Sequence, residues 1–598
     1  MLDNRHLITL TNAHNIVDKF ISGAKVWNDF ISDYPEANIH FHVKNLDHFL
    51  PKGNIFDFSE YKFPLKGNVK FSGINFGNIK VDFSGAIFGE GNILFNNCQF
   101  GDKDILFLNT NFGNGIVTFE NAKFGNGNIY FIDAKFGNGN IYFTSCNFGD
   151  GDVSFYGAQF KEGDIIFHKA IFGDGDVSFN NISTGNSNAY FDNMQFGSGN
   201  VSFNNITFGS GVTTFSRTFF GKGNVIFYNA NFGEGIVSFD RTQFSEGKVI
   251  FDHAYFGDGD TYFRTTSFDE NYISFKKVNF GSGSFSFKDS IFSNCEFVFN
   301  DAVFSEGFVD FSDIEFSSNK INPIHFQNIS FSERGANFSR SNFGHSKIYF
   351  DYSDFKGHVS FVNLTNSNEI LSLSFKHCIF HKSLNLESNK FNFVPDLTNT
   401  SLNNQLSIQG FMCKPSPTDD GVPKAIDAIR FCRLKELAEA NKSHQQALIF
   451  HIQEMRIKRF YINKGRRFLD LIFDKTCHYG NSISIPSKIL LGMTGVFWFI
   501  YFCISRLTIC KNLEYLECAK IFDIPEFVGN SLLFTITQTI LFMSAGNKIA
   551  DETAKSLFLI DNKGDIPHFI YGIGVIQGVI SFILLFLIGL GLRHRFRL

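Results

Sequence analysis

Phenylalanine sets the dominant pattern of this chain, where it recurs with a 12-residue period. One series runs from Phe71 to Phe311 and a second from Phe76 to Phe316, and the unit is well seen in "FGNGNIYFIDAK" at 124–135. A fixed period of this kind predicts a solenoid, in which each repeat buries its apolar face only by stacking on its neighbours.

Within each unit the apolar positions are spaced as in short β-strands. An Ile or Val is followed by Phe two residues later, by a small residue three after that, and by Phe again two later. A helical repeat needs apolar spacings of three and four over about ten or more residues, and the glycines of Gly-x-Gly would weaken it. We therefore expect a β-strand repeat in which Gly-x-Gly supplies the positive φ of a wide corner.

The "AxF" and "IxF" segments at these distances resemble pentapeptide-repeat proteins. That resemblance implies a four-sided, right-handed β-helix with a bulky residue at the centre of each side and a small residue two before it. Because the Phe spacings alternate five and seven, four sides make a 24-residue coil with four Phe pointing inward. A 12-residue coil is the rival, but two Phe and an Ile on every layer would overpack a two-sided interior. Roughly 14 coils, about 4.8 Å apart, are expected.

The expected fold class is mainly β: a long right-handed β-helix with a 12-residue sequence period, followed by an α-helical C-terminal membrane domain. Helical apolar spacing before Pro35 predicts a cap over the first coil, and its "WN" followed by Pro resembles the segment before the repeats in one branch of the pentapeptide-repeat family. The expected domains are a helical N-terminal cap (1–52), the β-helix (53–412), a Pro-rich linker (413–423), a cytosolic helical hairpin with a juxtamembrane helix (424–480), and a two-span membrane domain with a re-entrant helix (481–598).

The repeat register slips by three residues at 317–325 and becomes irregular beyond Phe375. A surface loop is the simplest explanation of the slip and a partner-binding bulge is the alternative; the sequence leaves both open. The prolines of "KPSPTDDGVP" then disfavour regular structure after the last coil.

After Pro423 the apolar spacing becomes helical and predicts a two-helix hairpin with Ser443 as an N-cap. The apolar positions are Ile426, Ile429, Leu434 and Leu437 on the first helix, and Leu448, Ile452 and Met455 on the second. Positive charge beside the amphipathic stretch that follows predicts contact with the cytoplasmic leaflet, with a solvated charged face as the alternative. The residues expected at the membrane surface are Arg456, Lys458, Arg459, Arg466 and Arg467, together with Arg593, Arg595 and Arg597 near the C-terminus.

Two apolar stretches are long enough to cross a bilayer. Residues 489–505 are uncharged but at the short end of the range, and residues 569–592 contain Gln577 as their only strongly polar side chain. Basic residues precede the first stretch and follow the second, so both flanks are expected in the cytoplasm. The predicted location is the cytoplasmic (inner) membrane of a bacterium, with two spans and with the N- and C-termini cytoplasmic.

Between these stretches, residues 524–548 contain an apolar run too short to span, which predicts a re-entrant or interfacial helix. The order of span, half-helix and span resembles the two-span pore domain of potassium-type channels, which implies four copies around a shared pore. The hairpin, the "YG" before the first span and the terminal "FLIGLGLRHRFRL" resemble the C-terminal membrane module of bacterial pentapeptide-repeat proteins. If a pore forms, its candidate lining is Thr535, Thr537, Gln538, Thr539, Ser544 and Gly546.

The channel resemblance is incomplete at the selectivity filter. A potassium filter needs Thr-Val-Gly-Tyr-Gly or a close variant, since its carbonyl groups replace the water around the ion, whereas this chain offers Ser544-Ala545-Gly546-Asn547. The alternative role for these hydroxyl and amide groups is to hold helices together in lipid.

Composition supports a solenoid and argues against catalysis. Phe accounts for 81 of 598 residues and Trp for only 2. The ten cysteines form no CxxC pair, and Cys98 and Cys146 fall in the small inward position, which predicts buried thiols in a reducing compartment. Acidic "GDGD" segments are better explained by turn chemistry than by calcium. No catalytic set or metal cluster stands out, so we expect neither an enzyme nor a cofactor, and no secretory signal is visible.

From Phe71 to Phe316 the chain has 28 Asp and Glu against 14 Lys and Arg, a net charge of −14. We expect a membrane-anchored protein whose β-helix senses or docks an unknown protein or ligand, and whose C-terminal module forms an oligomeric ion pore, a tetramer by the channel resemblance. A non-conducting membrane-tethered scaffold is the first alternative. The second is an acidic mimic of DNA that binds a topoisomerase, a property of some pentapeptide-repeat proteins; nucleic acid itself is an unlikely partner.

Overall fold

The computed structural model describes residues 7–10, 19–41, 55–269, 271–317, 321–402, 406–510, 524–539, 544–558 and 566–595. The chain divides into two compact units, Met1–Ser416 and Pro417–Leu598. The first unit is a β-solenoid and the second is helical.

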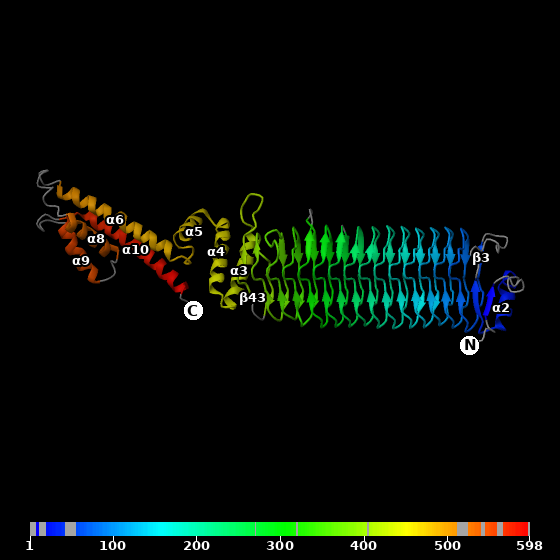
Figure 1. The fold of residues 1–598 in the computed structure, drawn as a ribbon. Coiled ribbons are helices and arrows are strands. Elements are labelled where there is room, and N and C mark those ends of the chain that lie inside the picture. The colour runs from blue at the N-terminus through cyan, green and yellow to red at the C-terminus, as the bar shows by residue number, and fades with distance from the viewer. Residues whose placement is uncertain are drawn as a thin grey trace. The chain divides into compact units, whose positions relative to one another are not determined.

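The first unit is a mainly β, parallel solenoid of about 15 coils with a period of about 24 residues (Figure 1). Ile93 pairs with Val117, and Val117 pairs with Ile141, so each strand pairs with the strand two sequence units further along. This register confirms the 24-residue coil and excludes the 12-residue rival, because a shorter coil would pair each strand with the strand of the very next unit.

Most strands are two or three residues long, and they line up in sheets that run along the solenoid. The largest, with 17 strands, includes β1 (Leu7–Leu10) and β43 (Leu406–Ser407), and the next, with 14, extends from β3 (Ile55–Asp57) to β38 (Ser372–Ser374). The shorter sheets extend from β19 (Phe219–Phe220) to β31 (Glu315–Ser317), from β33 (Ser330–Phe331) to β42 (Ser401–Leu402), from β10 (Lys135–Phe136) to β13 (Gln159–Phe160), and from β41 (Lys390–Phe391) to β44 (Met412–Cys413).

Four columns of Phe rings fill the interior. Phe71 stacks on Phe95 with centroids 4.6 Å apart and planes 1° apart, and Phe83 on the opposite side meets Phe71 edge to face at 85°. The second series forms two further columns, in which Phe76 stacks on Phe100 at 4.6 Å. Offset-stacked and edge-to-face rings are the favoured aromatic geometries, so the predicted inward direction of both Phe series is confirmed.

The small inward position also carries a hydrogen bond where it is Thr, Ser or Cys. The Thr110 hydroxyl donates to the Phe83 carbonyl at 2.8 Å, and the Cys98 thiol donates to the Phe71 carbonyl at 3.1 Å. Cys98 and Cys146 are fully buried free thiols. Burial raises the pKa of Cys98 to about 12, which makes its thiol unreactive at neutral pH.

The Gly-x-Gly corners combine positive φ with close packing between coils. Gly115, the second glycine of its corner, is not in the left-handed region, but a Cβ there would lie 2.0 Å from the Gly91 carbonyl oxygen of the coil before. Left-handed residues other than glycine recur at the other corner of the sequence unit, as at Asn97 (φ 57°) and Asn109 (φ 52°). The expectation of positive φ therefore holds at Gly113, the first glycine of this corner (φ 66°), whereas close packing against the preceding coil explains the glycine at position 115.

Asn and Asp side chains at these corners bond to the coil that follows. The Asp152 carboxylate accepts from the Asp176 backbone N–H at 2.9 Å, and the Asp176 carboxylate accepts from the Asn200 N–H at 2.7 Å. These ladders give the carboxylates of the "GDGD" segments a role in hydrogen bonding between coils, which the turn-chemistry interpretation did not include. Within the described residues no group of three His, Cys, Asp or Glu is placed to hold a metal ion.

Residues 1–52 do more than form a helical cap. Helix α2 (Ala24–Ser32) buries Trp27, whose indole N–H donates to the Lys62 carbonyl at 2.8 Å. Before and after it, β1 and β2 (Asn38–Phe41) pair in parallel, and β2 continues onto β4 (Val69–Lys70). The parallel sheet therefore begins upstream of residue 53, contrary to our prediction.

The predicted slip of three residues is seen in the strand register. Val298 pairs with His325, three positions beyond its partner in the regular register. Further on the coil shortens, and Ile379 pairs with Ser401, two positions before its partner in the regular register. Residues 318–320, at the centre of the slip, lie outside the described part of the chain.

The second unit contains the predicted hairpin and two long helices, and one helix that we did not expect. Its elements are α3 (Ala425–Ala440), α4 (His444–Lys458), η3 (Arg459–Tyr461), α5 (Lys464–Cys477), α6 (Ser484–Cys510), α8 (Ile524–Thr539), α9 (Ser544–Phe558) and α10 (His568–Arg595). In the hairpin, Ile426 and Ile429 are exposed, whereas Phe431 and Leu434 are buried. Ser443 is the N-cap residue of α4, but its side chain makes no capping hydrogen bond.

Candidate functional site

Helices α6 and α10 are long and apolar enough to cross a membrane, over Ser484–Thr508 and His568–Arg593. They include the two stretches expected from the sequence. Gly591, near the end of α10, packs closely against Ile483, just before α6, so the two helices run antiparallel.

Helix α10 has the reverse of the pattern found in a helix of a water-soluble protein. Its buried face carries the small or polar residues Gly574, Gln577 and Ser581 beside the apolar Leu584 and Leu587. Its exposed face is large and apolar, with Val575 60% exposed and Phe586 63% exposed. Small residues at helix contacts and large apolar residues facing outward are typical of helices surrounded by lipid.

Gln577 joins α10 to α8. Its side-chain amide donates to the Thr535 carbonyl and to the Thr539 hydroxyl, both at 2.9 Å. A Cβ on Gly574 would lie 2.9 Å from Gln538 Oε1, so the small residue lets the two helices approach. The one strongly polar side chain of the second apolar stretch therefore contacts another helix and not the surface.

Of the six candidate pore residues, three are buried hydroxyls of α8. Thr535, Thr537 and Thr539 each donate to a backbone carbonyl three or four residues earlier in the same helix. Within one chain these three hydroxyls are satisfied and face other helices. Ser544 and Gly546 belong to the first turn of α9, and their side chains lie outside the described part of the structure.

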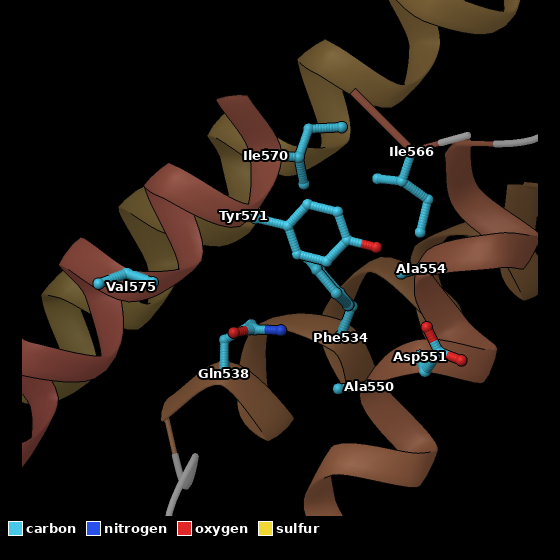
Figure 2. A pocket seen from close by; sticks show the side chains of 9 residues that line it. All are labelled: Phe534, Gln538, Ala550, Asp551, Ala554, Ile566, Ile570, Tyr571 and Val575. Carbon is cyan, nitrogen blue, oxygen red and sulfur yellow. The ribbon is translucent and has the colours of Figure 1, made fainter. Parts of the chain in front are cut away.

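Gln538, the remaining candidate, lines a cavity of about 240 Å³ between α8, α9 and α10 (Figure 2). Its walls are mostly apolar, from Phe534, Ile566 and Ile570, and they also include the polar groups of Asp551 and Tyr571. Asp551 pairs with Lys555 at 2.9 Å on the exposed side of α9.

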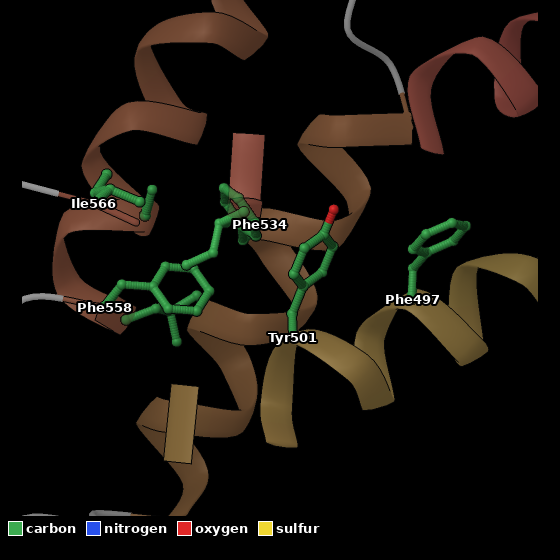
Figure 3. Packing of buried hydrophobic residues seen from close by; sticks show 8 residues of the cluster. Phe497, Tyr501, Phe534, Phe558 and Ile566 are labelled. Carbon is green, nitrogen blue, oxygen red and sulfur yellow. The ribbon is translucent and has the colours of Figure 1, made fainter. Parts of the chain in front are cut away.

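Helices α8 and α9 are held to α6 by an aromatic cluster (Figure 3). Tyr501 meets Phe534 edge to face at 4.9 Å, and Phe534 meets Phe558 at 5.8 Å. The Ser505 hydroxyl of α6 donates to the Leu557 carbonyl of α9. Where a single half-helix was expected, the structure has two helices, α8 and α9, that pack together. The extra helix α9 is absent from the expected order of span, half-helix and span.

A network of ion pairs links α4, η3 and α5. The Asp474 carboxylate accepts from Arg456 at 2.9 Å and from Arg459 at 2.6 Å, and Arg459 also pairs with Asp470. Burial by itself would raise the pKa of Asp474, but the hydrogen bonds from the two arginines outweigh it and hold that pKa below its usual value. Burial and Asp470 raise the pKa of Tyr479, which joins the same network, to about 12.

The basic residues expected at the membrane surface therefore fall into two groups. Arg456 and Arg459 pair with Asp474, and Lys458 pairs with Glu454. Arg466, Arg467, Arg593 and Arg595 are exposed, and Arg597 lies outside the described residues.

Helix α5 repeats the reversed pattern of α10. Asp470 and Asp474 face the arginines of α4 and η3, while Phe468 and Leu469 are 64% and 67% exposed. This arrangement was not among the features predicted from the sequence. The signal was present in "FLDLIFD", where two carboxylates four residues apart lie on one side of a helix that is otherwise apolar.

Comparison with family models, with curated proteins and with solved structures finds no match for this chain.

Proposed function

We propose that this chain is a membrane-anchored docking protein, in which the helical unit is embedded in a bilayer and the β-solenoid is presented to a partner in the cytoplasm. The observation that carries the proposal is α10, which buries its polar Gln577 and Ser581 and exposes a broad face of large apolar residues that includes Val575, Phe582 and Phe586. In water such an exposed face would be unfavourable, whereas in lipid it is the favourable one.

The orientation follows from the basic residues at the ends of the two spans. Exposed Arg466 and Arg467 precede α6, and Arg593 and Arg595 end α10, so the positive-inside rule places both flanks in the cytoplasm. The resemblance to bacterial pentapeptide-repeat proteins makes this the inner membrane.

Helix α5 is proposed to lie on the cytoplasmic surface of the bilayer. Its exposed Phe468 and Leu469 would enter the acyl boundary, and Arg466 and Arg467 would meet anionic headgroups. The inward carboxylates of α5 are already neutralised by arginines and would not oppose such binding.

Sodium carbonate extraction of membranes from cells that express the full chain tests the anchor. We expect the protein to stay in the membrane pellet and to be released only by detergent. A variant with Phe582→Lys and Phe586→Lys, on the exposed face of α10, should lose membrane insertion, because a lysine at the centre of a span costs about 2.5–3.5 kcal/mol. Lys442→Gln, in the hairpin turn, is the control and should stay inserted. Release of the wild-type protein by carbonate would refute the anchor.

An ion pore is the second proposed function, and it rests on Gln538 and on the channel resemblance. Gln538 supplies a polar group to the cavity beside α10, whereas the threonines of α8 are engaged in helix packing. Because one chain has two spans, a pore requires several copies.

Oligomeric state in mild detergent, followed by ion flux into liposomes, separates a pore from a scaffold. A tetramer that conducts, with flux changed by Gln538→Leu and unchanged by Gln445→Leu on the exposed side of the hairpin, would support the pore. A monomer, or an oligomer without ion flux, would exclude the pore and support the non-conducting scaffold.

A further inference from the structure

One corner of the solenoid carries an unusual concentration of positive charge. Arg217 and Arg241 occupy the same position of successive coils, and Arg264 and Lys288 continue the neighbouring position on the next two coils. We call these four residues the arginine corner. Together with Asp240 and Asp289 they line a surface hollow of about 580 Å³, on a solenoid whose net charge from Phe71 to Phe316 is −14.

Arg217 and Arg241 differ from Arg264 and Arg340 in having no ion pair within the described residues. Arg264 pairs with Asp240 at 2.5 Å, and Arg340 pairs with Asp313 at 2.7 Å, each with a carboxylate one coil away. Arg217 and Arg241 instead occupy the same corner of two adjacent coils. Coils lie about 4.8 Å apart, and like charges on adjacent strands are destabilising.

The backbone makes the choice of arginine more unusual. Both residues have φ of 59°, in the left-handed region, where Asn is the favoured non-glycine residue. Asn does occupy the equivalent corner position elsewhere, at Asn193, Asn205 and Asn229. Placing arginine at this corner of two adjacent coils is therefore unfavourable for the backbone conformation and for the electrostatic energy. Local destabilisation of this kind is typical of a functional surface.

Two carboxylates near these arginines, those of Asp192 and Asp240, already accept hydrogen bonds, and a third, that of Asp289, lines the same hollow. Asp240 accepts both nitrogen donors of Arg264, and the half-buried Asp192 accepts from the Thr214 hydroxyl at 2.7 Å. The guanidinium groups of Arg217 and Arg241 thus remain able to bind carboxylates supplied from outside the chain.

We propose that the arginine corner is the docking site for an extended acidic segment of a partner protein. The inference rests on the proposed role of the solenoid as a docking arm, and it names the surface and the partner's chemistry. The four coils span roughly 14 Å, which matches about four to five residues of extended peptide. A nucleic acid would continue beyond the corner onto an acidic surface and would be repelled there.

The test uses the full chain in detergent and a fluorescein-labelled oligoglutamate peptide, with binding followed by fluorescence anisotropy. We expect the wild-type protein to bind at about 0.1 M salt and to release the peptide near 1 M, where charges are screened within about 3 Å. The double variant Arg217→Asn, Arg241→Asn should bind about tenfold or more weakly, since it loses two charge-assisted contacts.

Asparagine is chosen because it fits the left-handed corner, so this variant should fold at least as well as the wild type. Lys123→Asn with Lys135→Asn removes the same charge from other exposed positions and should bind normally. Equal binding by the two double variants, or equal binding of an oligoglutamine peptide, would overturn the proposal. Tighter binding of a DNA oligonucleotide through the same arginines would overturn it in favour of nucleic acid. Carbonate extraction of the same variants tests the membrane anchor separately.

Discussion

At the scale of single residues, the solenoid is constrained most tightly at its corners. Hydrophobic positions inside the coil accept several residue types, since the small inward slot holds Cys98, Thr110 or Ala122. At corner glycines such as Gly115 the facing carbonyl of the preceding coil lies where a side chain would begin, although Lys103 and Ser187 occupy the equivalent position in other units.

Gly115→Ala tests this constraint. A Cβ would lie 2.0 Å from the Gly91 oxygen, so the two coils must separate, and we expect a loss of about 1–3 kcal/mol in the free energy of unfolding. Thermal unfolding of the full chain in detergent, followed by circular dichroism, would measure it. Gly465→Ala is the matched control, because nothing lies within 4 Å of its added methyl group. An unchanged midpoint for Gly115→Ala would contradict the packing explanation.

At the scale of elements, helices α5 and α10 share one property: each buries its polar groups against a neighbouring helix and exposes apolar side chains. In α10 the buried group is the Gln577 amide, and in α5 it is the pair of carboxylates that meet Arg456 and Arg459. Breaking such contacts leaves buried polar groups without partners, which destabilises more than the net value of the contact.

Asp474→Asn tests the link between α4 and α5. The folded-state pKa of Asp474 is lowered, so its ionised form contributes stability above the unfolded pKa of about 3.9, and that contribution is lost as pH falls further. The difference in melting temperature between the wild type and Asp474→Asn should therefore be large at neutral pH and shrink below about pH 4. Asp551→Asn removes an exposed ion pair, in which the Asp551 side chain is 56% exposed, and should change little. A difference that stays constant between neutral and acid pH would exclude the ion-pair explanation.

At the scale of the whole molecule, the solenoid is modular, and its stability depends on contacts between neighbouring coils. Each strand pairs with the equivalent strand of the coil before it and with that of the coil after it. Length can therefore change in whole coils without disturbing the register elsewhere.

Deletion of residues 125–148 tests this modularity. It removes one coil and joins Phe124 to Gly149, so every remaining strand finds an equivalent neighbour, and we expect a folded protein with a similar melting temperature. Deletion of 125–130 removes a quarter of a coil and should unfold the solenoid, since strands would face corners. Circular dichroism and limited proteolysis distinguish the two. Equal damage by both deletions would show that the coils are not interchangeable.

The division of the chain at Ser416 supports a second prediction at this scale. Because Met1–Ser416 and Pro417–Leu598 are separate compact units, a fragment of residues 1–416 should remain in the supernatant after ultracentrifugation of a cell lysate. A fragment of residues 417–598 should sediment with membranes. Sedimentation of the first fragment with membranes would place membrane contacts on the solenoid itself.

The sequence by itself determined the parallel solenoid, its 24-residue coil, the inward Phe series and the two apolar helices. It could do so because a repeat places equivalent residues directly above one another, so a local pattern specifies long-range contacts. The slip of three residues near Ser317 was visible for the same reason.

The tertiary structure decided what depends on neighbours that the repeat does not specify. Only the packed helices bring Gln577 to Thr535, place Asp474 between Arg456 and Arg459, and pair α8 with α9. The glycine at position 115 likewise needed the distance between coils, because the space open to a side chain there is set by the facing backbone.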